Sequence, residues 1–516
     1  MKESMFWADQ IAREAKPHNE KHVVSDAKTP SGRIHVGSLR GVVIHDLIYK
    51  AILKSGQKAE YLYRFDDFDP MDGFPPDLPE SFKKHMGEPL CNVPSPKKGF
   101  DSLAQYYALE FQEVFEKLGC KPKIVWASES YKKGKMNDLI KIALEHAETI
   151  REINEKTSGA KKESNWLPIN VVCEKCGKIG TTKASDFDGK TVAYSCADVK
   201  YAKGCGHEGR ISPFNGNSKL TWKVDWAAVW PLYEITIEGA GKDHYAAGGS
   251  RDVANKLSDE IFKYPHPYNF PYEFFLLGGK KMSSSKGIGV SAKEMAELLP
   301  QELLRFLLTR FKPRSAINFS PEGKTIPNLF DDYDAFSKAF FHPENLRDPD
   351  MPRIFELSNL NEKPVEMFLP QFSLVAAIAQ VPSVNEEEFF TQQKGSELSK
   401  KEKEVLKERI VYAKTWLENF AEEEDKLTFL SIEKSKEKRE TLTKNQLNAL
   451  NDFAQMLDSE QQETVKKLCS NNNLSPQEFF TAAYLVLTGK EKGPKLMPLI
   501  KALGTSFVKK RFSETK

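Results

Sequence analysis

The sequence has little of several features that would place a protein in a special class. No apolar run is long enough to cross a bilayer, and Met1–Asp9 lacks the basic start and apolar core of a secretory signal. Seven cysteines, an odd number found mostly in one cluster, argue against a disulfide framework and for a reducing compartment. Neither charge sign is in excess, because 75 Lys and Arg against 73 Asp and Glu give a net charge of +2. We therefore expect a cytoplasmic protein whose partners include neither a membrane nor DNA.

What is present is a long chain of ordinary globular composition. Its 516 residues are 40% hydrophobic and 29% charged, and such a length suggests about three domains. Strand-like and helical segments alternate as far as about residue 330, which predicts an α/β fold with a Rossmann-like parallel sheet. Beyond that point glycine is sparse, and charged helical segments predict an all-α domain, with helices at 397–424, 444–457, 460–470, 475–488 and 494–510. We expect a Rossmann-like domain in two halves, at residues 1–165 and 217–330. A zinc-ribbon-like insertion at 166–216 separates the halves, and the helical domain covers residues 331–516.

Two short stretches far apart in the chain have the parts needed to hold a nucleotide triphosphate. Residues 29–38, TPSGRIHVGS, predict a turn after a strand and then the start of a helix. A helix N-terminus offers free N–H groups and partial positive charge to a phosphate, and His35 can donate to a phosphate oxygen. Residues 281–287, KMSSSKG, predict a loop whose Lys281 and Lys286 can neutralise charge on a transferring phosphoryl group. Each stretch alone is a weak signal, but in this order beside an α/β sheet the pair is much stronger.

Four cysteines in a short polar stretch predict a structural metal site. Cys173 and Cys176 form a C-x-x-C pair, and Cys196 and Cys205 follow. This spacing suits tetrahedral Zn²⁺, which would supply folding energy that so small a core lacks. His207 is an alternative to Cys205 as the fourth ligand, and the spacing leaves that choice open. The other interpretation is a small hairpin of cysteines without a metal.

Acidic and aromatic residues follow several of the strand-like segments. Asp66 and Asp67 come directly after the predicted strand at 59–65, and ligands of parallel sheets bind at the carboxyl ends of the strands. Residues 220–226, LTWKVDW, predict another strand that leads into the site. His244 follows a glycine-rich turn after a further strand, where functional residues gather. Taken alone, the acidic residues are equally well explained as turn formers, and the aromatic residues as part of the core.

The motifs resemble those of one enzyme class. Residues 35–38 resemble the HIGH motif, and residues 281–285 the KMSKS motif, of class I aminoacyl-tRNA synthetases. More narrowly, the class I lysyl-tRNA synthetases of archaea and some bacteria are similar at residues 29–37, 223–226, 241–244 and 281–287. The resemblance is good over residues 1–330, whereas the tail resembles the family only in being helical. It implies a lysine–tRNA ligase that forms lysyl-adenylate from ATP with Mg²⁺ when tRNA is present. The lysyl group then passes to the 2′-hydroxyl of the 3′-terminal adenosine of tRNA(Lys), and the helical domain binds the anticodon.

The same resemblance implies roles for individual residues. Catalysis falls on His35, Gly37, Ser38, Lys281, Ser283, Ser285 and Lys286. ATP binding falls on Pro30, Ser31, Gly32, His35, Val36, Gly37, Ser38, Lys281, Met282, Ser283, Ser284 and Ser285. Lysine binding falls on Ala27, Thr29, Trp222, His244 and Tyr272. A lysine ammonium also needs a carboxylate, and we include Asp66 in the site, with Asp67 and Asp225 as the other candidates.

Some positions depart from the family pattern, and other functions are possible. Ser38 stands where a His is usual, Ser284 where the second lysine of KMSKS is usual, and Ala27 where a glycine is usual. A glutamyl- or glutaminyl-tRNA synthetase is the nearest alternative, because residues 64–67 resemble that subclass too. It would need an Arg just before the first motif to meet an acidic substrate, and none is there. A small-molecule nucleotidyltransferase leaves the ribbon and tail unexplained, and a zinc- and helix-based RNA-binding protein leaves both motifs unexplained.

Overall fold

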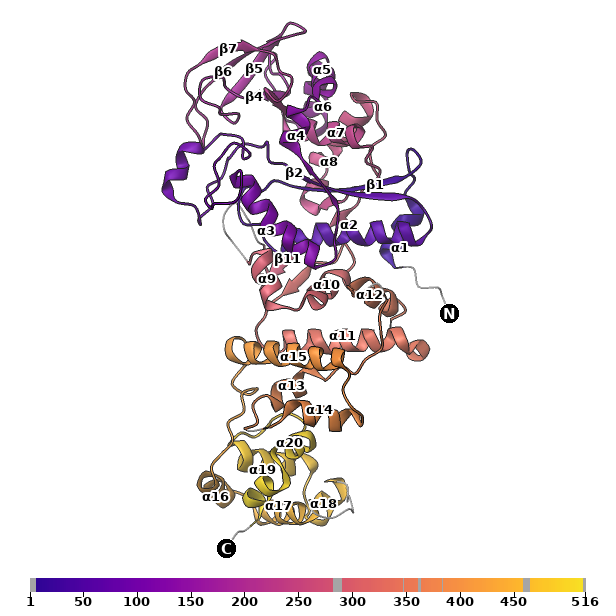
Figure 1. Cartoon of the computed structure of the whole chain (residues 1–516), viewed down its shortest axis with the longest axis vertical. Coiled ribbons are helices and arrows are strands. Elements are labelled where there is room, and N and C mark those ends of the chain that lie inside the picture. The colour runs from indigo at the N-terminus through magenta and orange to yellow at the C-terminus, as the bar shows by residue number, and fades with distance from the viewer. Residues whose placement is uncertain are drawn as a thin grey trace. The chain divides into compact units, whose positions relative to one another are not determined.

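The computed structural model describes residues 6–281, 290–346, 348–360, 363–382, 384–457 and 465–513, without the side chains of Lys280, Lys281 and Asn345. The chain divides into two compact units. Unit 1 contains residues 1–319 and 346–362, and unit 2 contains residues 320–345 and 363–516. None of the helices described is both long enough and apolar enough to cross a membrane. Figure 1 shows strands and helices mixed in the first unit and helices in the second.

A parallel sheet forms the centre of unit 1. Its strands β1, β2 and β3 pair in that order and span His22–Lys28, Ala59–Phe65 and Lys123–Trp126. Parallel bridges from Val24 to Ile237, and from Ile237 to Tyr268, extend the sheet on the other side of β1. The spatial order is therefore β3, β2, β1, the chain at 237 and the chain at 268. This is the doubly wound arrangement, in which the order reverses beside the first strand and ligands bind at the carboxyl ends. The predicted Rossmann-like fold is confirmed.

Helices cover both faces of this sheet (Figure 1). The face with α2 (Gly37–Lys54) also carries α1 (Trp7–Glu14) and α3 (Leu103–Lys117). The second face carries α4 (Ala127–Lys132), α5 (Asn137–Glu145), α6 (Ala147–Ser158), α7 (Trp222–Tyr233) and α8 (Ser250–Glu260). Most of the helix α2 is buried because its sequence is apolar around most of its circumference.

An antiparallel insertion interrupts the alternation. The strands β4 (Ile169–Val171) and β8 (Ser218–Leu220) pair at its base. Between them β5, β6 and β7 form a three-stranded sheet in that order, at Thr182–Phe187, Val192–Cys196 and Glu208–Ile211. We call residues 169–220 the ribbon.

The rest of unit 1 contains short strands and helices. The strand β9 pairs with β10, and β11 lies between β12 and β13. In chain order, β9 spans Ala240–Gly241, β10 Pro271–Tyr272, β11 Phe275–Leu277, β12 Lys280–Lys281 and β13 Ile317–Phe319. The helices are η1 (Glu80–His85), η2 (Lys242–Tyr245), α9 (Ala292–Leu298), α10 (Gln301–Thr309) and α12 (Met351–Ser358).

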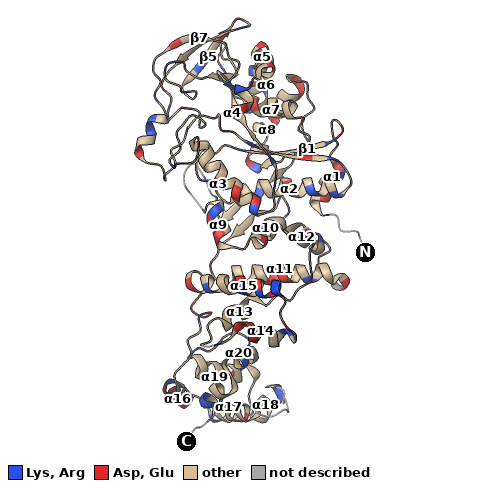
Figure 2. Ribbon diagram, in the orientation of Figure 1, with Lys and Arg blue, Asp and Glu red and all other residues tan. Residues whose placement is uncertain are grey.

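Unit 2 has helices joined by loops and no strands among its described residues. Its helices are α11 (Thr325–Phe341), η4 (Pro343–Asn345), α13 (Phe372–Ile378), α14 (Glu386–Lys394), α15 (Lys400–Asn419), α16 (Ile432–Glu440), α17 (Lys444–Met456), α18 (Val465–Asn471), α19 (Pro476–Thr488), α20 (Leu496–Leu503) and α21 (Thr505–Phe512). Figure 2 shows acidic and basic residues intermixed along α15, as expected of a solvated helix face. The predicted all-α domain is confirmed, although the segment 494–510 forms two helices separated by Gly504, whose φ is 80°.

One prediction about local structure is wrong. The segment 220–226 was expected to be a strand, but β8 ends at Leu220 and α7 begins at Trp222. In α7, Trp222, Trp226 and Trp230 recur every four residues, and this spacing places them on one side of a helix. Tryptophan favours strands in general, and here the spacing of the residues outweighs that preference.

Candidate active site

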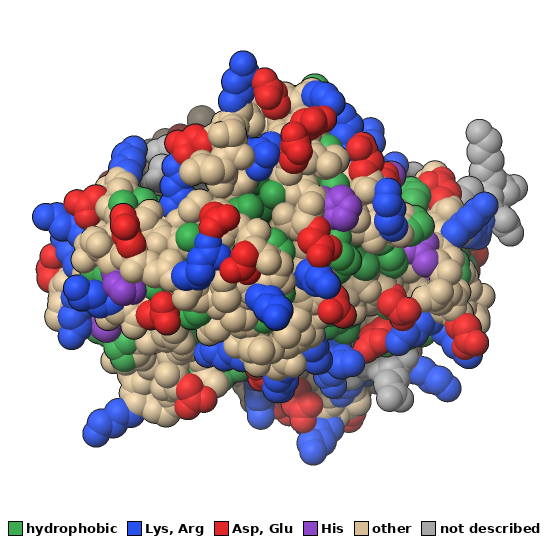
Figure 3. All heavy atoms as spheres, turned by 90° about the horizontal axis from the view of Figure 1, so that it is seen from above, with side chains coloured by type: hydrophobic (Ala, Val, Ile, Leu, Met, Phe, Trp, Pro, Cys, Tyr) green, Lys and Arg blue, Asp and Glu red, His purple; other side chains and the backbone are tan. Residues whose placement is uncertain are grey.

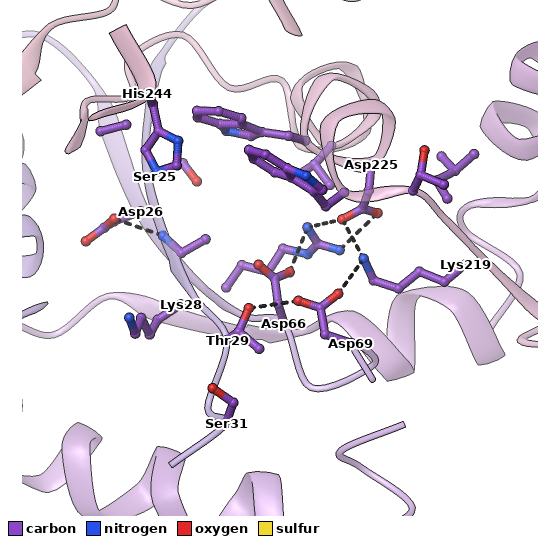
Figure 4. A pocket seen from close by; sticks show the side chains of 18 of the residues that line it. Ser25, Asp26, Lys28, Thr29, Ser31, Asp66, Asp69, Lys219, Asp225 and His244 are labelled. Carbon is purple, nitrogen blue, oxygen red and sulfur yellow. Dashed lines mark hydrogen bonds and ion pairs between the residues drawn. The ribbon is translucent and has the colours of Figure 1, made fainter. Parts of the chain in front are cut away.

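A cavity of about 790 Å³ lies at the carboxyl ends of the parallel strands. The end of β1, the loop after β2, β8 with the start of α7, and the turn after residue 237 form its wall. Figure 4 shows charged side chains from these segments converging on one another. The structure brings together all six residues that were expected to bind the amino acid: Ala27, Thr29, Asp66, Trp222, His244 and Tyr272.

Arg64 and Asp225 form the buried centre of a charged group in this wall. Arg64 Nη1 donates to Asp225 Oδ2 at 2.8 Å and Nη2 donates to Oδ1 at 3.2 Å. Tyr131 Oη donates to Asp225 Oδ1 at 2.6 Å, and Lys219 Nζ lies 3.2 Å from Oδ2. Burial alone would raise the pKa of Asp225, but Arg64 and Lys219 hold it well below its ordinary value. Asp225 is therefore saturated with donors and has no lone pair left for a substrate ammonium.

Two further carboxylates complete the group and face the cavity. Asp69 accepts from Thr29 Oγ1 at 2.8 Å and pairs with Lys219 Nζ at 2.9 Å. Asp66 pairs with Arg64 Nη1 at 2.9 Å through one oxygen. Two cations thus face three carboxylates, and the group carries one excess negative charge when Asp66 is ionised. Burial raises the pKa of Asp66 to about 7, with Asp69 and Asp225 adding to the rise, so a cation arriving beside Asp66 would stabilise its ionised form.

Aromatic side chains form another part of the wall. The rings of Trp222 and Trp226 stack with centroids 5.9 Å apart, and the His244 ring lies 5.4 Å from that of Trp226. Trp222 is 49% exposed, which is unusual for a large apolar residue. Behind them Glu238 Oε2 accepts from the Trp226 and Trp230 indoles at 2.7 and 2.8 Å and pairs with Arg251 at 3.1 Å. Glu238 is therefore neutralised inside the protein.

The first motif forms the turn into α2 and lies next to the chain that follows the second motif. Val36 N donates to Val290 O at 3.1 Å, Ala292 N donates to Ile34 O at 2.9 Å, and His35 forms an antiparallel bridge with Ser291. Residues 290–292 come shortly after the lysine–serine stretch in sequence, so the first motif lies beside chain that is some 250 residues away in sequence.

Not every predicted nucleotide-binding residue lines the cavity. Ser31 does, whereas the cavity's lining does not include Pro30, Gly32, His35, Val36, Gly37 and Ser38. The side chain of Lys281 lies outside the described part of the structure, as do Met282, Ser283, Ser284, Ser285 and Lys286.

The four cysteines of the ribbon gather at one point. The sulfur atoms of Cys173, Cys176, Cys196 and Cys205 all lie within 4.8 Å of one another. The Sγ atoms of Cys173 and Cys205 are 3.6 Å apart, and those of Cys176 and Cys196 are 3.7 Å apart. Four thiol groups converging in this way fit a tetrahedral metal ion. His207 is not part of this group of four.

Several residues of the site were missed from the sequence. Arg64 and Lys219 supply the cations of the charged group, and Asp26 also lines the cavity. Asp67, a candidate for the ammonium, instead accepts from Ser128 N and Oγ at 2.8 and 2.5 Å at the start of α4. The run of acids after β2 signalled a site, but only the fold shows which of those acids faces it.

Comparisons with known proteins agree with this architecture. Residues 5–361 match the family model described as tRNA synthetases class I (K), and residues 365–516 match one described as an anticodon binding domain. A lysine–tRNA ligase of Methanosarcina barkeri is 34% identical, over all of this chain and 98% of that protein. The lysine–tRNA ligase of Methanocaldococcus jannaschii is 34% identical over 99% of both chains. That of Archaeoglobus fulgidus is 33% identical over 98% of this chain and 99% of its own.

Proposed function

The chain belongs to the class I (K) family of tRNA synthetases, and we propose from this that it is a lysine–tRNA ligase. It would join lysine to the 3′-terminal adenosine of tRNA(Lys) through a lysyl-adenylate made from ATP. The single observation that carries the choice of amino acid is the surplus of carboxylates over paired cations in the cavity wall. The charged group sets three carboxylates against two cations, and Asp26 in the same wall adds a carboxylate without a Lys or Arg partner among the described side chains. This surplus suits an amino acid that brings a second positive charge besides its α-ammonium.

The activation step joins the lysine carboxylate to the α-phosphate of ATP. The carboxylate attacks in line and pyrophosphate leaves, so the protein's task is to position the reactants and to neutralise charge. We assign the phosphates to the N-terminus of α2, where no side chain caps the helix, together with His35 and Ser38. Lys281 and Lys286 would steady the departing pyrophosphate, and Mg²⁺ would neutralise the phosphate oxygens.

The transfer step brings in the RNA. A ribose hydroxyl of the terminal adenosine attacks the lysyl-adenylate, and AMP leaves. We assign binding of the anticodon to residues 365–516, in agreement with the family model for that region. A requirement for tRNA in the activation step and transfer to the 2′-hydroxyl belong to the same proposal.

The four cysteines of the ribbon would hold a structural Zn²⁺. All four positions of a tetrahedral shell are taken by thiolates, so the ion would have no open position for catalysis. A cytoplasmic location accords with thiols that must stay reduced to bind the metal.

A glutamyl-type synthetase is the alternative that most needs a test. Its substrate has a carboxylate side chain, which the surplus of carboxylates in the cavity wall would repel. Pyrophosphate exchange and tRNA charging should be measured with each of the twenty amino acids, with and without total tRNA. We expect exchange with lysine only, and only when tRNA is present. Exchange driven by glutamate would replace the proposal, and no exchange with any amino acid at saturating tRNA would refute the synthetase assignment.

A further inference from the structure

Asp26 is a carboxylate of the cavity wall that neither the motifs nor the charged group accounts for. It lies in β1, its side chain is 10% exposed, and it lines the cavity. Its Oδ1 accepts from Ala27 N at 2.9 Å. Figure 4 shows it apart from the group formed by Asp66, Asp69, Lys219 and Asp225. Its partner must therefore be sought elsewhere.

The second oxygen of Asp26 occupies space that α2 leaves open at Gly41. A β-carbon on Gly41 would come within 2.7 Å of Asp26 Oδ2 and 2.8 Å of the Tyr272 hydroxyl oxygen. These approaches are too close for any residue but glycine without displacement of the oxygens. Two oxygen atoms, one from β1 and one from β10, therefore converge on one point beside the backbone of α2.

The His45 ring beside Asp26 is not a cation. His45 Nδ1 lies 3.7 Å from Asp26 Oδ2, but the Gly239 amide donates to His45 Nε2 at 2.9 Å. An amide can only donate, so Nε2 carries no proton, and the proton on Nδ1 is donated to Gly41 O at 2.7 Å. Burial lowers the pKa of His45 to about 4, which agrees with a neutral ring.

Among the side chains that the structure describes, no Lys or Arg nitrogen lies within 4 Å of the Asp26 carboxylate. The groups that face it are Lys28 on its own strand, Tyr61 and Tyr63 on β2, Tyr272 on β10 and His45 on α2. Asp225, Asp69 and Glu238, by contrast, each pair with a cation. A buried carboxylate without such a partner is costly in the ionised form. Burial raises the pKa of Asp26 to about 7 although the Ala27 amide and Lys28 oppose the rise.

We propose that Asp26, together with the Tyr272 hydroxyl, binds the ε-ammonium of the lysine substrate and so selects the amino acid. This inference rests on the proposed function. An ammonium has three donors, enough for both oxygens, and would supply the missing cation. The α-ammonium belongs at Asp66, because it shares a carbon with the reacting carboxylate, which must face the first motif. Asp66 is the more exposed of the two carboxylates, at 19%, and belongs to the group bonded to Thr29, where that motif begins.

The test compares lysine with norleucine, which has the same chain without the ε-nitrogen. In Asp26→Asn the shape and the bond from Ala27 are kept, but the charge is lost. We expect the KM for lysine to rise roughly 10- to 100-fold, the scale of one charge-assisted hydrogen bond. The inhibition constant of norleucine and the KM for ATP should stay within twofold of the wild-type values. The matched control is Glu60→Gln, a carboxylate of the same sheet that pairs at the surface with Lys21 and Lys123, and it should change none of the three values.

Two outcomes would overturn the assignment. One is an unchanged KM for lysine in Asp26→Asn, and the other is a loss of norleucine binding in proportion to that of lysine. Should Asp26→Asn fail to fold, Gly41→Ala tests the same contact, because its methyl group would displace Asp26 Oδ2 and Tyr272 Oη. It should weaken lysine and spare norleucine, and equal effects on both would count against the assignment. If the wild type does not charge tRNA with lysine, the proposed function itself fails. If the wild type charges lysine and the Asp26 variant behaves like it, only the role of Asp26 fails.

Discussion

Aspartates of one cavity differ in ionisation because their neighbours differ. Asp225 is surrounded by Arg64, Lys219 and the Tyr131 hydroxyl, and its pKa is lowered despite burial. Asp26 and Asp66 are buried with fewer opposite charges, and burial raises the pKa of each to about 7. Asp225 therefore stabilises the fold, whereas the ionised forms of Asp26 and Asp66 cost free energy until a cation binds. Groups whose pKa values differ in this way are frequent at functional sites.

Asp225→Asn should destabilise the protein. The change removes the carboxylate charge that pairs with both Arg64 and Lys219. It also puts an amide N–H group, which cannot accept a hydrogen bond, where a carboxylate oxygen accepted from these donors. We expect a loss of about 3 kcal/mol in the free energy of unfolding at neutral pH, measured by urea denaturation. The surface variant Glu60→Gln should lose less than about 1 kcal/mol. Equal losses in both would show that the buried pairing has no special role in stability.

The same variant should have a characteristic pH dependence. Because the folded pKa of Asp225 is lowered, its contribution is present above its unfolded pKa of about 4 and is lost as the pH falls towards the folded value. The difference in stability between wild type and Asp225→Asn should therefore be constant from about pH 5 to 8 and shrink below about pH 4. A difference that grew on acidification would contradict the assigned sign.

Among the elements, the ribbon has a direct connection to the cavity. Ile179 N and Gly180 N both donate to Gly87 O, at 2.8 and 2.9 Å. Gly87 belongs to the loop after β2, where Leu90 N also donates to Asp69 O at 2.9 Å. Ile179 and Asn170 of the ribbon line the cavity themselves. A metal in the ribbon would therefore hold the loop that carries Asp69.

Removal of the metal should affect the binding of lysine more than that of ATP. We expect one Zn²⁺ per chain by elemental analysis, and its loss in Cys176→Ser because the tetrahedral shell is broken. Hydrogen exchange should quicken in the ribbon and near Gly87, and the KM for lysine should rise several-fold more than the KM for ATP. Cys469→Ser changes a cysteine of unit 2, outside the cluster, and should keep the metal. Full metal content in Cys176→Ser would refute the proposed ligand set.

The helix α2 shows how one element serves two tasks. Residues 34–36, which lead into its first turn, bond to residues 290–292, which come after the second motif in sequence. One turn further, the bare backbone of Gly41 leaves room for Asp26 Oδ2 and the Tyr272 hydroxyl. The nucleotide side and the amino-acid side of the proposed reaction thus meet on successive turns of a single helix.

For the whole molecule, the two matched families divide the chain between residues 361 and 365. Figure 3, a view of one face, shows acidic and basic side chains intermixed, in keeping with a net charge of +2. On this face neither sign of charge dominates, so the face has no broad basic field of the kind that attracts RNA.

The proposed division of labour predicts how tRNA variants behave. A change of one anticodon base in tRNA(Lys) should lower kcat/KM for the tRNA roughly 5- to 150-fold, the equivalent of about 1–3 kcal/mol for one stacked base. The KM values for lysine and ATP should stay unchanged, because the cavity lies in the other unit. Transcripts with single anticodon changes, assayed beside an acceptor-stem variant, would measure this. Equal charging of all anticodon variants would contradict the role assigned to residues 365–516.

The sequence by itself determined the elements and much of the chemistry. The β–α alternation, the C-x-x-C pair and the motifs at 29–38 and 281–287 are patterns of neighbouring residues, and local spacing is enough to show them. The helical tail was predictable for the same reason. The failure at 220–226 came from weighing residue type above the four-residue spacing of its tryptophans.

Only the tertiary structure decided which charges are paired and which are open. Arg64 meets Asp225 across 161 positions, and His45 meets Gly239 across 194. Ionisation and hydrogen-bond saturation depend on distances of a few ångströms between such residues, and sequence spacing does not fix those distances. For this reason Asp67 and Asp225 were candidates as plausible as Asp66 from sequence, and Asp26 was not a candidate until the fold placed it above Gly41 without a cation.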